Sequence, residues 1–244
     1  MLEIDRVEKI LSELNERKRM TYKELEEIME VSLSTIKRDV GKMEQKGLLN
    51  KIKGGISQIS NMKNDKNVEE RFGENINEKK EIAIKALRTI KNDEFIYLDA
   101  GTTIFYLISK LKNKNVTVVT NGIMHIEELT KNKIRTIVIG GEVKDTTKAI
   151  VGAEAIQSLE KYRFDKCFIG VNGIDEKKGF TTPELNEAII KKKVLELSEM
   201  KYILADKSKF NKISNIQFAK IGDCKIITSD EAIKKNNKYK KYFI

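Results

Sequence analysis

Cysteine and long apolar runs are both scarce in this sequence of 244 residues. Its two cysteines, Cys167 and Cys224, have the spacing of neither a metal site nor a disulfide framework. No apolar stretch approaches the roughly 20 residues that a membrane-spanning helix needs. The acidic, amphipathic start of the chain does not resemble a secretion signal. We therefore expect a reduced, cytoplasmic protein that has no contact with a membrane and needs no metal or cofactor.

Charge is plentiful but unevenly distributed. The net charge is +10, and because lysine is abundant throughout the chain this excess is mainly compositional. Residues 1–36 contain six basic and nine acidic residues, whereas residues 37–58 contain six basic and only two acidic residues. Cations contribute to nucleic-acid binding where they cluster against phosphates. The local excess after residue 36 is therefore the informative feature.

Three helical patterns occupy the first 46 residues. Apolar residues recur at helical spacing from residue 3 to about residue 16, and Thr21 with Glu24 forms a capping box that opens a second helix. Ser34 is a good N-cap type for a third helix, which Gly47 would end. Two short helices joined by a tight link, the second of them basic, indicate a helix-turn-helix.

Residues 48–57 are predicted to form a hairpin with a Gly-Gly turn, which makes the module a winged helix. The third helix would place its first turns in a major groove of DNA. Asp39 is expected to pair locally and orient a basic side chain rather than touch DNA. A three-helix domain used for protein contacts is the alternative. The candidate DNA-contacting residues are Ser32, Ser34, Thr35, Lys37, Arg38, Lys51 and Lys53.

Polar residues without apolar periodicity fill residues 59–78, which predicts a linker between a DNA-binding domain at 1–58 and a second domain at 79–244. In the second domain, helical patterns alternate with short apolar runs. These runs cover residues 95–98, 116–119, 134–139, 167–171, 202–205 and 225–228. Such alternation predicts a mainly parallel α/β sheet whose two faces are covered, with ligands bound at the carboxyl ends of its strands.

Four loops after these runs carry small and polar residues. They are residues 99–103, residues 120–122, residues 140–141 with Lys144 close behind, and residues 170–173. The glycine, hydroxyls and free amides of the first loop suit an anion such as phosphate, although this loop is neither a Walker loop nor a dinucleotide fingerprint. Each loop alone is more typical of ordinary turns. A single crevice would explain all four.

Three further predictions concern single residues. His125, the only histidine, is expected at the surface or in packing rather than in a ligand site. Cys167 and Cys224 are expected to be core thiols. Thr182 is predicted to cap a helix whose first position is Pro183.

Both halves of the chain resemble the DeoR/GlpR family of bacterial sugar-metabolism regulators. Residues 31–40, followed by Lys46-Gly47-Leu48-Leu49 and Lys53-Gly54-Gly55, are similar to the family's DNA-binding signature, although Lys37 stands where the family usually has an arginine. Lysine is a point charge rather than a fork, so Arg38 carries more of the expected specificity. Arg71, Lys79 and Ile82-Ala83 resemble the family's entry into its second domain. The remaining similar stretches are residues 98–103, 119–121, 140–142, 151–152, 168–174, 187–191 and 206–210.

The resemblance implies a repressor of a sugar-utilisation operon, a homodimer or homotetramer, which a phosphorylated sugar releases from its operator DNA. It implies that the second domain is related in fold to ribose-5-phosphate isomerase. Among its cations, Lys144, Lys191 and Lys209 would be the ones to meet the phosphate. The effector contacts implied are Asp99, Gly101, Thr102, Thr103, Asn121, Gly140, Gly141, Lys144, Gly170, Asn172, Lys191, Asp206 and Lys209.

Two other functions are open to the same residues. Sugar-phosphate isomerisation needs a general base, for which Asp99, Asp175 or Asp206 are available. The isomerase loop rich in acids is here mostly neutral, at residues 170–175, which favours a regulator over an enzyme. A sugar-independent architectural DNA-binding protein fits poorly, because it would not need a large α/β domain with four polar loops.

Overall fold

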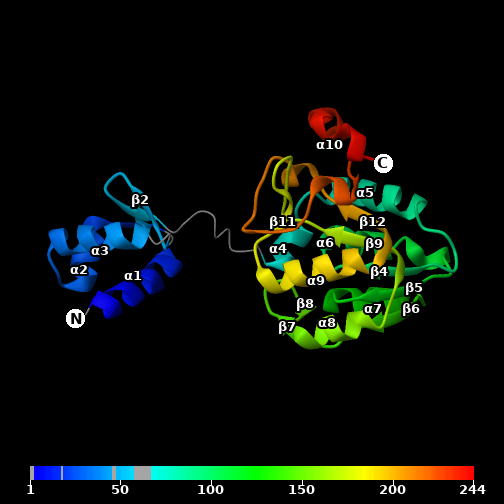
Figure 1. Cartoon of the computed structure of the whole chain (residues 1–244), viewed down its shortest axis with the longest axis horizontal. Helices are drawn as coiled ribbons and strands as arrows, with labels where there is room; N and C mark the ends of the chain where they lie inside the picture. Colours follow the sequence, from blue (N-terminus) through cyan, green and yellow to red (C-terminus); the bar gives the residue numbers. More distant parts are fainter. Residues whose placement is uncertain (1–2, 18, 46–47, 58–66) are drawn as a thin grey trace. The chain divides into compact units, whose positions relative to one another are not determined.

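A computed structural model describes residues 3–17, 19–45, 48–57 and 67–244 (Figure 1). The contacts divide the chain into two units, residues 1–63 and residues 64–244. Each unit has a hydrophobic core of its own and is described by itself.

The first unit contains three helices and a small antiparallel sheet. The helices are α1 (Glu3–Arg17), α2 (Tyr22–Met29) and α3 (Leu33–Gln45). The strands are β1 (Arg19–Thr21), β2 (Asn50–Ile52) and β3 (Gly55–Ser57), in the order β1-β3-β2. The three predicted helices and the hairpin are therefore present, whereas β1 was not predicted. The predicted helix stop at Gly47 lies outside the described residues.

Local sequence signals explain the ends of these elements. The capping box forms as predicted, because Thr21 Oγ1 accepts the Glu24 N–H at 3.2 Å and the Glu24 carboxylate accepts the Thr21 N–H at 2.7 Å. The turn of the hairpin is Lys53-Gly54 rather than Gly-Gly. Gly54 has the left-handed φ of 84°, while a Cβ on Gly55 would lie 2.1 Å from the Met20 carbonyl oxygen. The two glycines thus serve a turn and a close strand contact respectively.

A six-stranded parallel sheet forms the centre of the second unit. Its strands are β4 (Phe95–Leu98), β5 (Thr117–Thr120), β6 (Arg135–Val138), β9 (Phe164–Gly170), β12 (Ser198–Leu204) and β14 (Lys225–Ile227), in the order β14-β12-β9-β4-β5-β6. All five pairings are parallel. Each strand overlaps one predicted apolar run, although β9 and β12 begin three and four residues before theirs, and the expected parallel α/β architecture is confirmed.

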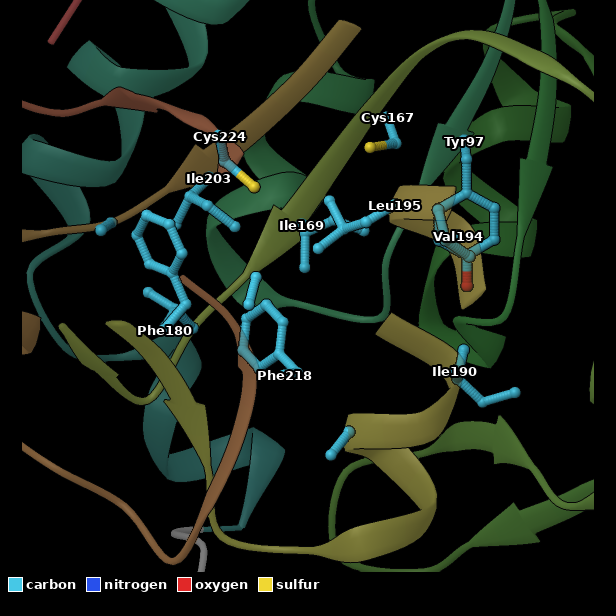
Figure 2. Close-up of a cluster of buried hydrophobic side chains, with 14 of the residues drawn as sticks. Tyr97, Cys167, Ile169, Phe180, Ile190, Val194, Leu195, Ile203, Phe218 and Cys224 are labelled. Carbon is cyan, nitrogen blue, oxygen red and sulfur yellow. The ribbon is translucent and has the colours of Figure 1, made fainter. Parts of the chain in front are cut away.

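Helices cover both faces of this sheet (Figure 1). On one face pack α5 (Ile76–Arg88), α6 (Thr102–Ile108) and Leu129 of α7 (Ile123–Lys131), and on the other pack α8 (Ala153–Glu160) and α9 (Leu185–Glu196). Along β4 the side chains alternate: Ile96 and Leu98 join the first core, and Tyr97 joins the second. Figure 2 shows Tyr97 on the second side, together with Val194 and Ile190 of α9. Burial on both faces is why the strands are continuous apolar runs.

Several elements of the second unit differ from the predictions. A helix, α4 (Val68–Phe72), and the first turn of α5 lie inside the predicted linker. Thr182 belongs to a strand, β11 (Gly179–Thr182), and α9 begins only at Leu185 with Glu184 as its N-cap. The predicted cap at Thr182 is wrong because this strand pairs with two others. Besides β11, the described strands of the second unit outside the parallel sheet are β7 (Glu142–Lys144), β8 (Ala149–Val151), β10 (Gly173–Asp175) and β13 (Ile216–Ala219).

Short helical segments complete the second unit. The 3-10 turn η1 (Leu111–Asn113) follows α6. The turns η2 (Lys207–Lys209) and η3 (Ile221–Asp223), the helix α10 (Asp230–Lys235) and the turn η4 (Asn237–Tyr242) lie nearer the end of the chain. The last residues cover one edge of the sheet, because the Ile244 N–H donates to the Ile226 carbonyl of β14 at 3.2 Å.

Candidate functional site

A cleft opens at the carboxyl ends of the parallel strands in the second unit. It contains about 700 Å³ of empty space, part of it open to solvent. Loops after β4, β5, β9 and β12 form much of its wall. Ten of the thirteen predicted effector contacts line it together. They are Asp99, Gly101, Thr102, Thr103, Asn121, Gly170, Asn172, Lys191, Asp206 and Lys209.

Three predicted contacts, Gly140, Gly141 and Lys144, are not among the described residues that line the cleft. Gly141 serves the fold, because it has φ 140° and a Cβ there would lie 2.6 Å from the Val151 carbonyl oxygen. The Lys144 ammonium donates to Glu187 Oε1 at 3.0 Å. A carboxylate 43 residues away in the sequence therefore holds this lysine.

Two side chains predicted to contact ligand also hold the cleft's loops together. Asp99 is buried, and its Oδ2 accepts the Gly170 N–H at 2.9 Å and the Lys191 ammonium at 2.5 Å. Asn121 Oδ1 accepts the Ala100 N–H at 2.9 Å. Lys191 was expected to meet the phosphate of an effector. Its positive charge is instead paired with the carboxylate of Asp99.

His125 packs beneath the first loop. It is buried, with Nδ1 3.3 Å from Thr120 Oγ1 and Nε2 3.3 Å from the Gly101 carbonyl oxygen. Burial lowers the pKa of His125 to about 4, so the ring is neutral at physiological pH. His125 is not among the described residues that line the cleft, and its burial fits the packing role expected for it.

A cluster of cations forms one side of the cleft. We call Arg71, Lys79 and Lys209 the cationic cluster; Glu74 and Asp206 lie in the same wall. Lys79 is buried and donates to the Arg71 carbonyl. Burial lowers the pKa of Lys79 to about 8, an effect that Asp206 opposes and that the positive charges of Lys209 and Arg71 reinforce.

Neither Arg71 nor Lys79 was among the predicted effector contacts. Arg71 lies in a polar stretch that resembled a linker. A signal for Lys79 was present, however, because it occupies the buried stripe of α5 with Ile82, Ala83 and Ala86. A lysine in an apolar stripe is rarely buried without a functional or structural partner.

The cleft is also lined by a buried carboxylate, Glu187. Glu187 is buried at the start of α9, and its Oε1 accepts from Lys144 at 3.0 Å and from Thr147 Oγ1 at 2.8 Å. Burial raises the pKa of Glu187, but Lys191, Lys144 and the hydroxyl of Thr147 together outweigh it and hold the pKa below its usual value. Glu187 is therefore an ionised acceptor at neutral pH.

The described residues contain no group of three or more His, Cys, Asp or Glu side chains placed to hold a metal ion. Their helices include none with the length and apolarity to cross a membrane. Cys167 and Cys224 are buried free thiols, as predicted, and burial raises the pKa of Cys167 to about 12.

The start of α3 presents the predicted DNA-contacting side chains of the first unit. Ser32 Oγ lies 3.0 Å from Ser34 Oγ and 3.1 Å from Thr35 Oγ1. The Arg38 side chain is 65% exposed, and the Lys37 ammonium lies 5.6 Å from the centroid of the Tyr22 ring. The two basic side chains in the first turns of α3, Lys37 and Arg38, are therefore both exposed.

The wing and Asp39 complete this surface. Lys51 is paired with Glu44 at 3.1 Å, while Lys53 is exposed in the turn. Asp39 is buried and accepts from Arg6 Nε at 2.8 Å, whereas Arg38 Nε is 4.0 Å away. The main partner of Asp39 is therefore a residue of α1, not a local one, and the pair fixes α1 against α3.

Comparison with known proteins gives matches over both units. Residues 6–62 match the DeoR-like helix-turn-helix domain, and residues 74–231 match the DeoR C terminal sensor domain. The chain is 39% identical over 231 residues to the uncharacterized HTH-type transcriptional regulator FruR of Bacillus subtilis, covering 94% of this chain and 92% of that one.

Two further relatives have similar coverage. The lactose phosphotransferase system repressor of Staphylococcus epidermidis is 30% identical, with 99% of this chain and 98% of that one covered. The L-fucose operon activator of Haemophilus influenzae is 34% identical, with 95% and 93% covered. Among solved structures, ribose 5 phosphate isomerase A of Neisseria gonorrhoeae matches with 19% identity and a TM-score of 0.42, over 57% of this chain and 54% of that one.

Proposed function

Because the chain belongs to the DeoR family of DNA-binding transcriptional regulators, we propose that it represses a sugar-utilisation operon and that a phosphorylated sugar releases it from the operator. The names of two relatives, for a lactose and an L-fucose system, support a role in sugar metabolism, and the first of them is named a repressor. The protein acts in the cytoplasm as a homodimer or homotetramer, which matches paired operator half-sites.

The cationic cluster is the observation that carries the effector half of this proposal. Arg71, Lys79 and Lys209 bring three positive charges to one wall, against the two carboxylates of Glu74 and Asp206. Keeping Lys79 charged there costs free energy, as its lowered pKa records. A bound phosphate offsets that cost, because it supplies negative charge and several acceptor oxygens. The backbone amides of Thr102 and Thr103, the first residues of α6, supply further donors.

Release requires that the effector bind one arrangement of the regulator better than another. Helix α4 is suited to transmit this preference, since it is the first described helix after the division between the units. It contributes Arg71 to the cleft, its Val68 N–H donates to the Thr146 carbonyl at 3.0 Å, and its Phe72 ring meets Phe105 edge-on at 5.0 Å. All three contacts join α4 to elements of the cleft wall.

Catalysis is not part of the proposal, because the protein is a transcriptional regulator and not an enzyme. The aspartates available as a general base are also occupied. Asp99 is tied to Lys191, Asp206 accepts from Asn75 at 3.2 Å, and Asp175 caps the turn after β10 outside the described cleft lining.

Two measurements on the full chain test the proposal. Footprinting on the promoter of the chain's own operon should show that Arg38→Ala loses specific binding by about tenfold or more, the cost of one base-reading arginine. A thermal-shift series with phosphorylated sugars should show the same stabilisation in this variant as in the wild type. Arg88→Ala, an exposed arginine of α5, is the matched control and should change neither result. A retained footprint in Arg38→Ala would refute the groove assignment, and a series without any stabilising sugar phosphate would refute the effector assignment.

A further inference from the structure

The charges of the cleft are divided into two unlike sets. In the cationic cluster, the charges that act on Lys79 belong to Asp206, Lys209, Arg71 and Glu74. The charges that act on Glu187 belong to Lys191 and Lys144. The strongest charge effects on Lys79 and on Glu187 therefore come from different residues.

We call Asp99 and Glu187 the carboxylate side of the cleft. Each of these two carboxylates is paired with one lysine, so the positive charges there do not outnumber the negative ones. Lys191 lies 2.5 Å from Asp99 Oδ2, and Lys144 lies 3.0 Å from Glu187 Oε1. Two lysines thus match two carboxylates, and all four groups are largely buried. A second phosphoryl group placed here would meet carboxylates before it met a cation that is not already paired with one.

Glu187 retains capacity to accept a hydrogen bond from a ligand. Its Oε1 accepts from Lys144 and Thr147, whereas its Oε2 has only the long 3.3 Å contact from Thr182 Oγ1 among the interactions of the described residues. A carboxylate offers about four acceptor sites. Glu187 lines the cleft beside Asn172, to which Thr182 also donates at 3.2 Å. A hydroxyl is a ligand group that can donate to Glu187 Oε2.

We propose that the carboxylate side recognises sugar hydroxyls and rejects a second phosphoryl group, so that Glu187 restricts the effector to singly phosphorylated sugars. The proposal rests on the function proposed above and adds to it the orientation and class of the ligand. The phosphate lies against the cationic cluster, and the far hydroxyls of the sugar donate to Glu187. Like charges brought together in a partly desolvated site repel each other, whereas a hydroxyl that donates to a carboxylate is favourable.

Calorimetric titration of the full chain tests this with matched sugars. The probes are inorganic phosphate, the 1-phosphate, 6-phosphate and 1,6-bisphosphate of fructose, and the corresponding three phosphates of glucose. For the sugar that binds best, we expect a monophosphate to bind about tenfold or more tightly than the bisphosphate of the same sugar. Glu187→Gln should weaken binding of the monophosphate. It should also shift the ratio of monophosphate to bisphosphate affinity toward the bisphosphate by about tenfold, because it removes one negative charge and leaves Lys144 without its carboxylate.

Glu196→Gln is the matched control. It makes the same change on the same helix, at the exposed last residue of α9 outside the described cleft lining, and should leave the ratio unchanged. Inorganic phosphate should bind wild type and Glu187→Gln equally, which shows that the variant is folded and that the cationic cluster is intact.

The outcomes separate the two proposals. If the wild type binds a bisphosphate as tightly as the monophosphates, or if Glu187→Gln leaves the ratio unchanged, the role of Glu187 is refuted while the effector cleft stands. If no sugar phosphate binds more tightly than inorganic phosphate, the proposed hydroxyl contacts are refuted. If neither phosphate nor any phosphorylated sugar binds, the proposed function fails, and this inference fails with it.

Discussion

Lys79→Met gives the sharpest test of the electrostatics of the cleft. The pKa of Lys79 falls from 10.5 to about 8 in the folded protein. At about 1.4 kcal/mol per unit, the charged lysine is disfavoured by about 3 kcal/mol relative to the unfolded chain. Methionine avoids this cost but loses the hydrogen bond to the Arg71 carbonyl, which is worth about 1–2 kcal/mol. Without ligand at pH 7, the variant should therefore be about 1–2 kcal/mol more stable than the wild type.

The pH dependence fixes the sign of this effect. Between pH 8 and pH 10.5 the unfolded chain keeps the Lys79 proton while the folded protein loses it, so the stability of the wild type rises with pH in this window. Below about pH 8 the full cost of the charged lysine is present. Lys79→Met has no such group. Its advantage over the wild type should therefore shrink and then reverse as the pH is raised from 8 to 10.5.

Urea unfolding of the second unit within the full chain, followed from pH 7 to pH 10, measures both effects. Lys80→Met is the control, because Lys80 is the exposed neighbour on the same helix and should show no such trend. Inorganic phosphate should stabilise the wild type and Lys80→Met but stabilise Lys79→Met much less. A variant less stable than the wild type at pH 7, or a difference that does not change between pH 8 and pH 10, would show that Lys79 carries no buried-charge cost.

Two further predictions concern the connection between the units and the core. Phe72→Ala removes the ring contact with Phe105 and should reduce the factor by which a sugar phosphate weakens operator binding, by about fivefold or more in gel-shift assays, with little change in operator affinity without ligand. An unchanged factor would exclude α4 from the coupling. The Tyr97 hydroxyl is buried without a hydrogen-bond partner among the described residues (Figure 2). Tyr97→Phe should leave the protein as stable or up to about 1 kcal/mol more stable in urea unfolding, and a loss above about 1 kcal/mol would reveal a missed interaction.

The parallel sheet was predictable because its strands are buried on both faces. A run such as Phe95–Leu98 is apolar throughout and is flanked by helical patterns, so its length and composition suffice. The short antiparallel strands have no such signature. Glu142–Lys144 has two exposed residues and charges at both ends, and Gly173–Asp175 contains a single large apolar side chain, Ile174. Pairing with distant segments makes these residues strands, and no local pattern records that pairing.

The position of the cleft was also predictable, whereas the pairing of its charges was not. Parallel strands bring the loops after them to one edge, which is why Asp99, Asn121 and Asn172 meet. Which lysine remains unmatched depends on contacts across long separations in the sequence. Lys191 meets Asp99 over 92 residues and Lys144 meets Glu187 over 43, so two of the three lysines expected at the phosphate are already paired with carboxylates.

Under the proposed function, ligand choice and ligand response would depend on different parts of the cleft. Arg71 and Lys79 belong to α4 and α5, the segment that follows the division between the units, and the Lys79 ammonium bonds the Arg71 carbonyl. An anion held there would contact α4, the first described helix after that division. Glu187 lies instead on α9, on the other face of the sheet from α5. Changes at Arg71 or Lys79 should therefore alter affinity and coupling together, whereas changes at Glu187 should alter which sugar is bound and leave intact the means by which it releases DNA.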